Sequence, residues 1–447
     1  MITLEGIVKG VAWRRGRREY TLTDGSADFG FYTDGLLAQG MAISLEGEMG
    51  VGKIAAAKVE VLEGGREAKV MEKVRKNIAS SVSLPDNPAL VNDPAMEKLW
   101  PRLKEAALEI TYAKRLGRAV LLRFHGDADG ICGAFAITSL LPCKVFQQNS
   151  AIYSVKDALR DMAFIGQEGR PLVILLDFGS NDASEEGRKL LEAGAVDWLV
   201  IDHHPYTKEH PRIANPAIDP DASVYTAGYL AAEVAIACGL DKGKGRELAA
   251  IACSGDKSQV ISNGENEMKK ALVLDFLASH ISYGNNLDFY KKVMAKEELF
   301  SSIARQADET IEEAAGKAMK GMKKTEAGKL LVVSFALEGI AKRGEWPPSS
   351  KITTRVFDKL KGERPLVCLG QTDRSIIMRL DDGAVSLGLS ANKLAEKLKE
   401  SMADFVEGGG GHTRAGAIRA REGFAKDVLN ELLREISAEA VVERVQE

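Results

Sequence analysis

The sequence predicts an α/β protein in which a small β-barrel precedes two α/β domains. Three observations support this fold class. Short segments with alternating apolar and polar residues fill the N-terminal part of the chain. Near-continuous apolar runs of strand length recur after residue 119, and helical patterns separate these runs. Because such runs are typical of parallel strands covered on both faces, we expect a parallel sheet between layers of helices.

Residues 1–66 are expected to form the barrel. They contain five short strand patterns, and the second closes on an Asp24-Gly25 turn of the kind found in hairpins. Five strands with these turns suit an OB-fold, whose strand face binds oligonucleotides. The five patterns are Leu4–Val11, Glu19–Gly25, Phe29–Tyr32, Met41–Glu48 and Ala55–Leu62.

Arginines and aromatic residues cluster near the first turn of the predicted barrel. Stacking aromatic rings beside a basic loop are the physical basis of single-strand binding, so this cluster predicts contact with nucleic acid. The alternative is a solvated hairpin loop over the barrel core. Two of the phenylalanines share one strand face, so one aromatic set is expected in the core. The arginines are Arg14, Arg15, Arg17 and Arg18, and the aromatic residues are Tyr20, Phe29, Phe31 and Tyr32.

The rest of the chain divides into four parts. Residues 67–118 are expected to be a helical connector, which Pro85-Asp86-Asn87-Pro88 interrupts. Residues 119–275 carry the strand patterns of the main α/β domain. A charged helical linker over residues 276–327 leads to a second, smaller α/β domain over residues 328–440.

Composition excludes some classes of protein. The formal net charge is −4, so the whole chain is not a basic nucleic-acid-binding protein, and any such site must be a local patch. Five cysteines without a CxxC pair are expected in a reducing cytoplasm. No apolar run is long enough to cross a membrane, and Met1 leads directly into a strand pattern. We therefore expect a cytoplasmic protein without a membrane partner.

Polar side chains follow the apolar runs at the points where the predicted strands end. Because ligands bind at the carboxyl ends of parallel strands, these side chains are expected to converge at one edge of the sheet. Carboxylate and imidazole groups mixed in this way suit Mn²⁺ or Mg²⁺ better than zinc or copper. Two such ions about 3.5–4 Å apart can clamp the attacking and leaving oxygens of a phosphoryl displacement. The segments are His125-Gly126-Asp127-Ala128-Asp129-Gly130, Asp177, Asp202-His203-His204 and Asp256.

These segments, followed by Gly408-Gly409-Gly410-Gly411-His412, resemble the DHH phosphoesterase superfamily in its RecJ-like branch. The resemblance covers residues 119–440, and within the superfamily it is to archaeal RecJ-like exonucleases and the Hef-associated nuclease. The Asp-His-His triplet alone would be weak evidence for this superfamily, but five motifs in the same order are specific to it. The resemblance implies a parallel-sheet DHH domain and a smaller α/β DHHA1 domain that binds substrate.

Carried over residue by residue, the resemblance implies a two-metal centre. His125 and Asp127 would bind one ion, and Asp129 would bind the other with His203. Asp177 would bridge the ions, and Asp256 would complete the cluster. Asp202 would orient a ligand. His204 would face the scissile phosphate, to stabilise charge or assist the leaving group.

The glycine run is implied to hold substrate. Successive glycine amides can form an anion-binding concavity, here expected between helices, to which His412 would add a donor and Arg414 a backbone contact. Arg379 takes the place of the family's strand arginine, although Ile377-Met378 stands where the family motif carries a serine. The alternative for Gly408–Gly411 is a glycine hinge.

The activity that the resemblance implies is metal-dependent hydrolysis of single-stranded DNA from one end, with RNA as a further substrate and Mn²⁺ preferred over Mg²⁺. Its setting would be DNA repair or replication, and the polarity stays open. The alternatives are a phosphatase of short oligonucleotides or nucleotides, a replication scaffold similar to Cdc45, and an inorganic pyrophosphatase, for which the glycine run and the barrel would be superfluous. The helices at 67–118 and 285–325 could contact a helicase or repair protein or a second copy of the chain; the alternative for them is ordinary interdomain packing.

Overall fold

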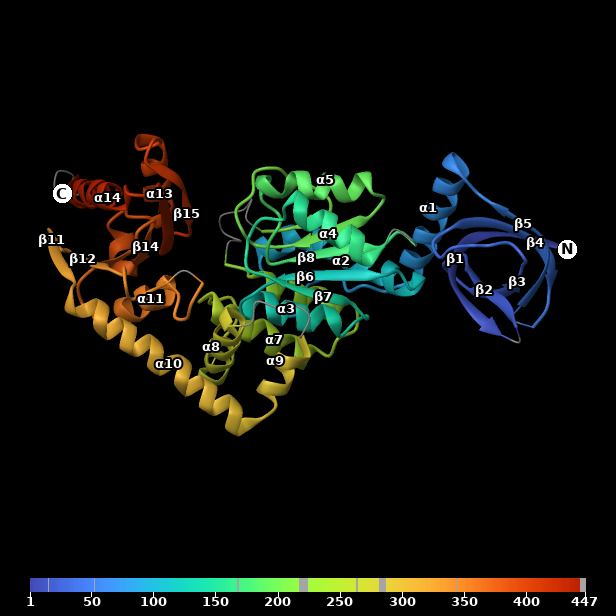
Figure 1. The fold of residues 1–447 in the computed structure, drawn as a ribbon, viewed down its shortest axis with the longest axis horizontal. Helices are drawn as coiled ribbons and strands as arrows, with labels where there is room; N and C mark the ends of the chain where they lie inside the picture. Colours follow the sequence, from blue (N-terminus) through green and yellow to red (C-terminus); the bar gives the residue numbers. More distant parts are fainter. Residues whose placement is uncertain are drawn as a thin grey trace. The chain divides into compact units, whose positions relative to one another are not determined.

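The computed structural model describes residues 1–442 apart from residues 15, 52, 167–168, 217–223, 263, 281–286 and 343. The chain divides into two compact units, Met1–Val293 and Met294–Glu447 (Figure 1). The predicted barrel, helical connector and main α/β domain lie in the first unit. The second α/β domain lies in the second unit, and the predicted linker over 276–327 is shared between them. The finer boundaries stay a prediction. Arg15 of the predicted basic loop lies outside the described residues.

The N-terminal strands close into a five-stranded barrel, in the order β1-β2-β3-β5-β4. Pairing is antiparallel except between β3 and β5, which run parallel. Alternate side chains point inward and form a compact core that includes Tyr20, Phe31 and Ile43. The strands are β1 (Ile2–Arg14), β2 (Arg17–Thr23), β3 (Asp28–Tyr32), β4 (Ala42–Met49) and β5 (Lys53–Val61).

Two helices follow the barrel, as the sequence predicts. Helix α1 (Gly64–Ser81) packs its apolar stripe with Ile7 and Ala42 of the barrel. Helix α2 (Pro94–Leu116) begins where the Asp93 carboxylate accepts a hydrogen bond from the Met96 amide, and it ends at Gly117 in the left-handed conformation. These helices connect the barrel to the main sheet within the first unit.

The main domain contains a five-stranded sheet in the order β10-β9-β8-β6-β7, and every pairing in it is parallel. Helices α4 and α5 lie on one side of the sheet, and α3 and α7 lie on the other (Figure 1). The strands are β6 (Val120–His125), β7 (Lys144–Gln148), β8 (Leu172–Leu176), β9 (Asp197–Ile201) and β10 (Ile213–Ala214). The helices are α3 (Ala128–Thr138), α4 (Val155–Ile165), α5 (Glu185–Ala193), α6 (Ala227–Ala237), α7 (Lys242–Gly255), α8 (Glu265–His280) and α9 (Leu287–Met294), with a 3₁₀ turn at Asp182–Ser184. This confirms the predicted parallel sheet.

The second unit contains a six-stranded sheet in the order β11-β12-β13-β14-β16-β15, with β12 and β13 parallel and the other pairs antiparallel. Its two faces carry separate cores: α10 and α11 cover one, and α13 and α14 cover the other. The strands are β11 (Lys323–Ala327), β12 (Leu330–Ala336), β13 (Leu366–Gln371), β14 (Ser375–Leu380), β15 (Val406–Gly411) and β16 (Ala415–Ala420). The helices are α10 (Glu297–Lys320), α11 (Ser349–Leu360), α12 (Asp382–Ser386), α13 (Ala391–Ser401) and α14 (Ala425–Val442).

The expected placement of Gly408–Gly411 between helices is wrong. The four glycines form most of strand β15, which is an edge strand paired with β16. The alternating segment Ala415–Ala420 gives the glycine backbone a ladder of hydrogen bonds, and this ladder replaces the expected concavity. An edge strand still presents one row of unpaired backbone groups, so the run keeps some backbone donors for a ligand.

Within the described residues, no helix is both long and apolar enough to cross a membrane.

Candidate metal centre

Asp177 lies at the centre of the predicted site, directly after strand β8. Its backbone is held at φ +63° by a 2.8 Å hydrogen bond from its amide to the Ile201 carbonyl. Its side chain is only 1% exposed, yet neither carboxylate oxygen has a hydrogen-bond partner within the described part of the chain. A buried carboxylate without donors is costly, and a left-handed non-glycine residue adds strain. Both features indicate that a group absent from the protein itself satisfies this side chain.

One oxygen of Asp177 faces the carboxyl end of β6. The His125 Nδ1 atom lies 3.4 Å from Asp177 Oδ2 and 2.6 Å from Asp127 Oδ2. Asp127 also caps α3, because its Oδ1 accepts a hydrogen bond from the Gly130 amide at 2.9 Å. The three side chains can each offer a ligand atom to one cation.

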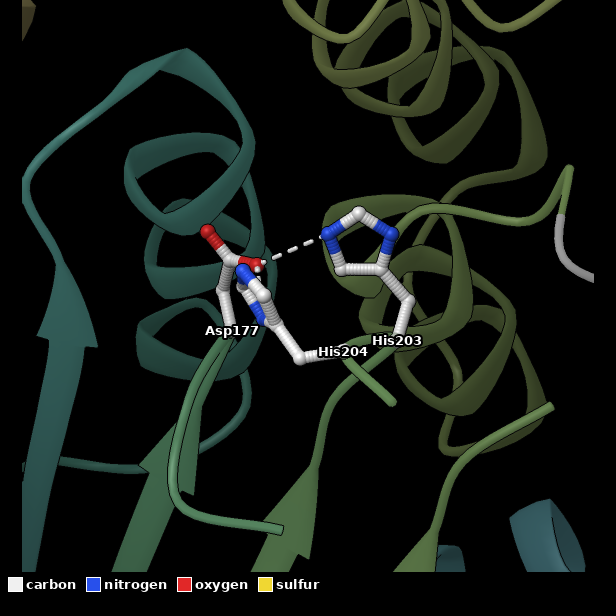
Figure 2. Close-up of side chains that lie close together, drawn as sticks. All are labelled: Asp177, His203 and His204. Atoms are coloured by element: carbon white, nitrogen blue, oxygen red, sulfur yellow. Dashed lines mark ion pairs between the residues drawn. The ribbon is translucent and has the colours of Figure 1, made fainter. Parts of the chain in front are cut away.

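The other oxygen of Asp177 faces the segment after β9. The His203 Nε2 atom lies 3.2 Å from Asp177 Oδ1, and Figure 2 shows a dashed line for this pair. The same nitrogen lies 3.3 Å from Asp256 Oδ2 and 3.8 Å from Asp129 Oδ2. Asp129, His203 and Asp256 form a second group that could hold a cation. Asp177 therefore connects two ligand groups, one through each of its oxygens.

The carboxylates of this centre are crowded, and their pKa values reflect the crowding. Burial and the charges of Asp177 and Asp256 raise the pKa of Asp129 well above its ordinary value. Burial raises the pKa of Asp256 to about 6, even though the charge of His203 acts in the opposite direction. Burial disfavours a charged imidazole, but the carboxylates, Asp177 first, raise the pKa of His203 well above its ordinary value. Without a cation, the negative charges of the carboxylates are reduced only by protons that the carboxylates and His203 retain.

These residues fit divalent cations. Asp177 offers two acceptor atoms without donors, the four carboxylates bring excess negative charge, and the ligand set mixes oxygen with imidazole nitrogen. That mixture suits Mn²⁺ or Mg²⁺ rather than a thiolate-rich zinc site. Parallel strands explain the convergence, because β6, β8 and β9 all end at the same edge of the sheet.

Asp202 holds His204 and accepts no fewer than five hydrogen bonds. Its Oδ1 accepts from the His203 amide, the His204 amide and His204 Nδ1 at 2.7, 3.1 and 2.8 Å. Its Oδ2 accepts from the Ser180 amide and hydroxyl at 3.0 and 2.6 Å. Burial opposes the charged ring, but Asp202 raises the pKa of His204 above its ordinary value. Because its acceptor sites are already used, Asp202 is placed to orient His204 rather than to bind a cation.

Ser180 and Asn215 support this pair, and sequence reasoning did not assign either of them a role. The Asn215 Nδ2 atom donates to Ser180 Oγ at 3.0 Å and to the His204 carbonyl at 2.8 Å. Asn215 follows β10, which is the edge strand next to β9. The signal in the sequence was the Asn215-Pro216 dipeptide after a short apolar segment, a pattern also typical of an ordinary loop.

Two further contacts fix the start of α3. Both oxygens of Asp129 accept hydrogen bonds at 2.9 Å from the amides of Ala227 and Gly228, at the N-terminus of α6. The Ala128 amide donates to Asp275 Oδ1 of α8 at 2.7 Å. Asp275 is a third residue that the sequence did not single out. It fixes the backbone between Asp127 and Asp129, so it positions both predicted ligands.

The residues predicted to hold substrate lie together in the second unit. Arg379 of β14 is opposite Ala415 of β16, and Gly411 is opposite Gly416. The Arg379 guanidinium donates to Thr354 Oγ1 at 2.9 Å and to the Met378 carbonyl at 2.8 Å. Within the described residues it has no carboxylate partner, and burial lowers the pKa of Arg379. A desolvated guanidinium of this kind is a natural partner for a phosphate.

Two glycines of β15, which β16 separates from the strand of Arg379, leave the sheet surface open. A Cβ atom added to Gly408 or Gly410 would meet nothing within 4 Å, so packing does not require glycine at either position. A Cβ atom on Gly411, whose φ is +142°, would lie 2.3 Å from the Ala415 carbonyl oxygen, so this glycine is required by the backbone. His412 and Arg414 are exposed in the connection between β15 and β16, and Arg414 forms a 2.6 Å ion pair with Asp382.

The structure divides the aromatic residues that the sequence placed beside the basic loop. Tyr20 and Phe31 are 1% and 0% exposed and lie in the barrel core, and Phe29 packs against that core. Tyr20 and Phe31 cannot stack on a base, so for these two the alternative of a packed core is correct, whereas Phe29 is only partly buried. Tyr32 stays partly exposed at the barrel surface. The most exposed aromatic residue near the loop is Trp13, which the sequence analysis did not assign.

Comparisons with known proteins agree with this geometry. Residues 119–255 match the model of the DHH family, N-terminal domain. An uncharacterized protein of Methanocaldococcus jannaschii is 24% identical over 459 aligned residues, which cover 85% of this chain. The chain spans about 60% of the length of that curated relative.

Two solved structures share the fold. One is a DHH domain described as belonging to a member of a family of ribosomal proteins, with a TM-score of 0.72 and 24% identity over 84% of this chain and 99% of that one. The other is RecJ from Thermus thermophilus in complex with Mn²⁺, with a TM-score of 0.52 and 17% identity over 79% of this chain and 56% of that one. At these identities the likeness concerns the fold alone.

Proposed function

We propose that this chain is a DHH-family phosphoesterase that hydrolyses phosphodiester bonds of single-stranded nucleic acid, from one end of the strand, with two divalent cations. The observation that carries the proposal is the Asp177 carboxylate. It is buried, lacks hydrogen-bond donors within the described residues, and directs one oxygen at each of two ligand groups. A phosphatase with a single cation would not need such a connection between two groups.

We assign the two groups as separate cation sites. His125 and Asp127 would hold one ion, Asp129, His203 and Asp256 would hold the other, and Asp177 would be shared. When bound, two cations neutralise charge on the phosphoryl oxygens and make a water more acidic. The ligand chemistry supports Mn²⁺ first and Mg²⁺ second. The Mn²⁺ in the similarly folded RecJ structure supports the same choice.

His204 would act on the scissile bond, and Asp202 would orient His204. A carboxylate only accepts hydrogen bonds, so Nδ1 of His204 donates to Asp202, and the raised pKa favours a second proton on Nε2. A proton at Nε2 can stabilise charge on the phosphate or pass to the leaving oxygen. Ser180 and Asn215 keep this ring in place through Asp202 and the His204 carbonyl.

The second unit would hold the strand. We assign Arg379 to a substrate phosphate, because it is a half-buried cation without a carboxylate partner in the described residues. The bare backbone at Gly408 and Gly410 would let a nucleotide lie against strand β15. His412 and Arg414 would add contacts from the exposed connection after β15. The barrel, whose five-strand closure suits an OB-fold, would hold a more distant part of the strand.

All six proposed ligands lie close together, and this supports an active enzyme over a scaffold whose active site has decayed. Each of the six proposed ligands lies within 4.0 Å of another, and strain is retained at Asp177. An inactive scaffold would gain stability by losing these crowded charges. A phosphatase of short oligonucleotides would use the same centre but would not need the barrel.

The test is digestion of oligonucleotides of DNA and RNA labelled at either the 5′ or the 3′ end, with Mn²⁺, Mg²⁺ or EDTA. The proposal expects cation-dependent release of nucleotides from one end by the full chain. Asp177→Ala should abolish it, and the matched control Asp404→Asn, which changes an exposed carboxylate outside the site, should retain it. No hydrolysis of long single strands would refute the proposal. Hydrolysis confined to very short substrates would replace it with the oligonucleotide phosphatase.

A further inference from the structure

The first hairpin extends beyond the wall of the barrel. Strand β1 pairs with β4 only up to Ile7, and from Gly10 onward it pairs with β2 alone among the described strands. Strand β2 pairs with β3 only from Glu19 onward. The part of the hairpin in which Trp13 pairs with Arg18 and Arg14 pairs with Arg17 is therefore a two-stranded arm. An arm of this kind buries little surface of its own, so its composition is free to serve a ligand.

The arm holds positive charges that its own fold does not compensate. Arg14 lies directly opposite Arg17, and like charges in opposed positions destabilise a strand pair. Arg14 has an ion pair with Glu19 at 3.2 Å. Within the described residues, Arg17 and Arg18 form no salt bridge. The whole chain is acidic, so this concentration of arginine is local, and it creates a positive potential where the arm leaves the barrel.

Trp13 is the exposed ring on this arm. It is 70% exposed, whereas Trp100 and Trp198 are 4% and 3% exposed. Trp13 lies directly opposite Arg18, whose guanidinium carbon is 5.3 Å from the ring centroid. A large exposed ring costs free energy in water, and here an arginine lies over it. The pair provides a flat apolar surface and a cation at the same place.

A second cation and ring continue this surface onto the barrel. The Lys53 ammonium lies 5.1 Å from the centroid of the Tyr32 ring and 2.8 Å from Glu19 Oε1. Glu19 also pairs with Arg14, so it joins the arm to β3 and β5. We define the arm surface as Trp13, Arg14, Arg17, Arg18, Tyr32 and Lys53.

We propose that the arm surface binds single-stranded nucleic acid, with a base stacked on Trp13 and backbone phosphates paired with Arg17 and Arg18. The proposal rests on the proposed function, because the bound strand is the substrate of the metal centre. Exposed aromatic rings beside basic side chains bind single strands of any sequence, since every base has a flat face and every linkage a charge. The arm would therefore hold long strands without selecting a sequence.

The test is binding of the full chain, in EDTA so that the strand is not cleaved, to oligothymidylate and oligouridylate of about 16 nucleotides, the upper end of what one OB-fold covers. Trp13→Ala should weaken binding at least about fivefold, and Trp13→Phe should remove the quenching of tryptophan emission. Arg17→Gln/Arg18→Gln should lower the slope of log K against log salt by about 1.4, which corresponds to two phosphate contacts.

Matched controls separate the arm from general surface effects. Leu36→Ala removes a 75% exposed side chain elsewhere on the barrel, and Lys69→Gln/Lys73→Gln removes two exposed charges from α1. Both should bind as the wild type does. Equal affinity and salt slope in the arm variants would overturn the proposal, as would a wild type that does not bind either strand. Binding that depends on the arm, without cleavage when Mn²⁺ is restored, would support the arm and refute the proposed function.

Discussion

The substitution Asp177→Asn tests the shared carboxylate most sharply. Asparagine has nearly the same shape and tolerates the left-handed backbone at φ +63°, so the fold should survive. The change removes the negative charge that faces both His125 and His203. A single carboxylate is thereby lost from two ligand groups at once.

The size of the effect follows from this double role. Loss of a group that merely supports a metal ligand costs about 10- to 100-fold in affinity or activity, which serves as a lower bound for a ligand itself. If both cation sites are affected, the two losses multiply to about 100- to 10,000-fold in affinity or activity, or about 2.8–5.6 kcal/mol. Asp256→Asn affects one group, so it should cost about 10- to 100-fold, or about 1.4–2.8 kcal/mol.

The assay measures kcat/KM for a single-stranded oligonucleotide across a Mn²⁺ titration, together with Mn²⁺ binding by calorimetry. The logarithm of the loss in Asp177→Asn should be about twice that in Asp256→Asn, and Asp404→Asn should match the wild type. Equal losses in the two variants would refute the shared role of Asp177. Unchanged affinity for both cations in Asp177→Asn would refute it as well.

Four further substitutions test the residue that supports His204 and the residues proposed to hold substrate. Asn215→Ala should lower kcat about 10- to 100-fold while Mn²⁺ binding by calorimetry is unchanged, because it loosens His204 and removes no ligand. Arg379→Gln should raise KM about tenfold, or about 1.4 kcal/mol, at unchanged kcat, as measured by initial rates. Gly410→Ala should raise KM without changing the thermal unfolding midpoint, since its Cβ meets nothing within 4 Å. Gly411→Ala should lower that midpoint, because its Cβ would lie 2.3 Å from a backbone oxygen.

Each of these expectations has a result that contradicts it. Weakened Mn²⁺ binding in Asn215→Ala would make this residue part of the cation site. A lower kcat with unchanged KM in Arg379→Gln would move the arginine from holding substrate to the chemical step. An unfolding midpoint that falls as much in Gly410→Ala as in Gly411→Ala would show that both glycines are needed by the strand.

The convergence of the proposed metal ligands was predictable because the strand pattern and the residue types both pointed to one sheet edge. Apolar runs of strand length end at His125, Asp177 and Asp202, and parallel strands bring their carboxyl ends to one edge. The direction in which each oxygen of Asp177 points was not predictable. It depends on the left-handed backbone at this residue and on the hydrogen bond to Ile201. No sequence pattern indicates either of these features.

Other features could not be predicted from the sequence because they depend on tertiary structure. Tyr20 and Phe31 belong to the core only once the barrel closes and fixes which strand face is inside. The glycine run became strand β15 because β16 supplies its ladder, which outweighs the turn preference of glycine. Ser180 and Asn215 are common residue types in loops, and only the convergence of β8, β9 and β10 brings them to Asp202 and His204.

The most direct test of the account is one titration. Mn²⁺ is added stepwise to EDTA-stripped protein at a concentration well above the dissociation constants, and hydrolysis of an end-labelled single strand is measured at each step. If Asp177 joins two cation sites into one centre, as proposed, hydrolysis should be almost absent at one equivalent and complete at two. Full hydrolysis at one equivalent, or none at any Mn²⁺ concentration, would contradict the account.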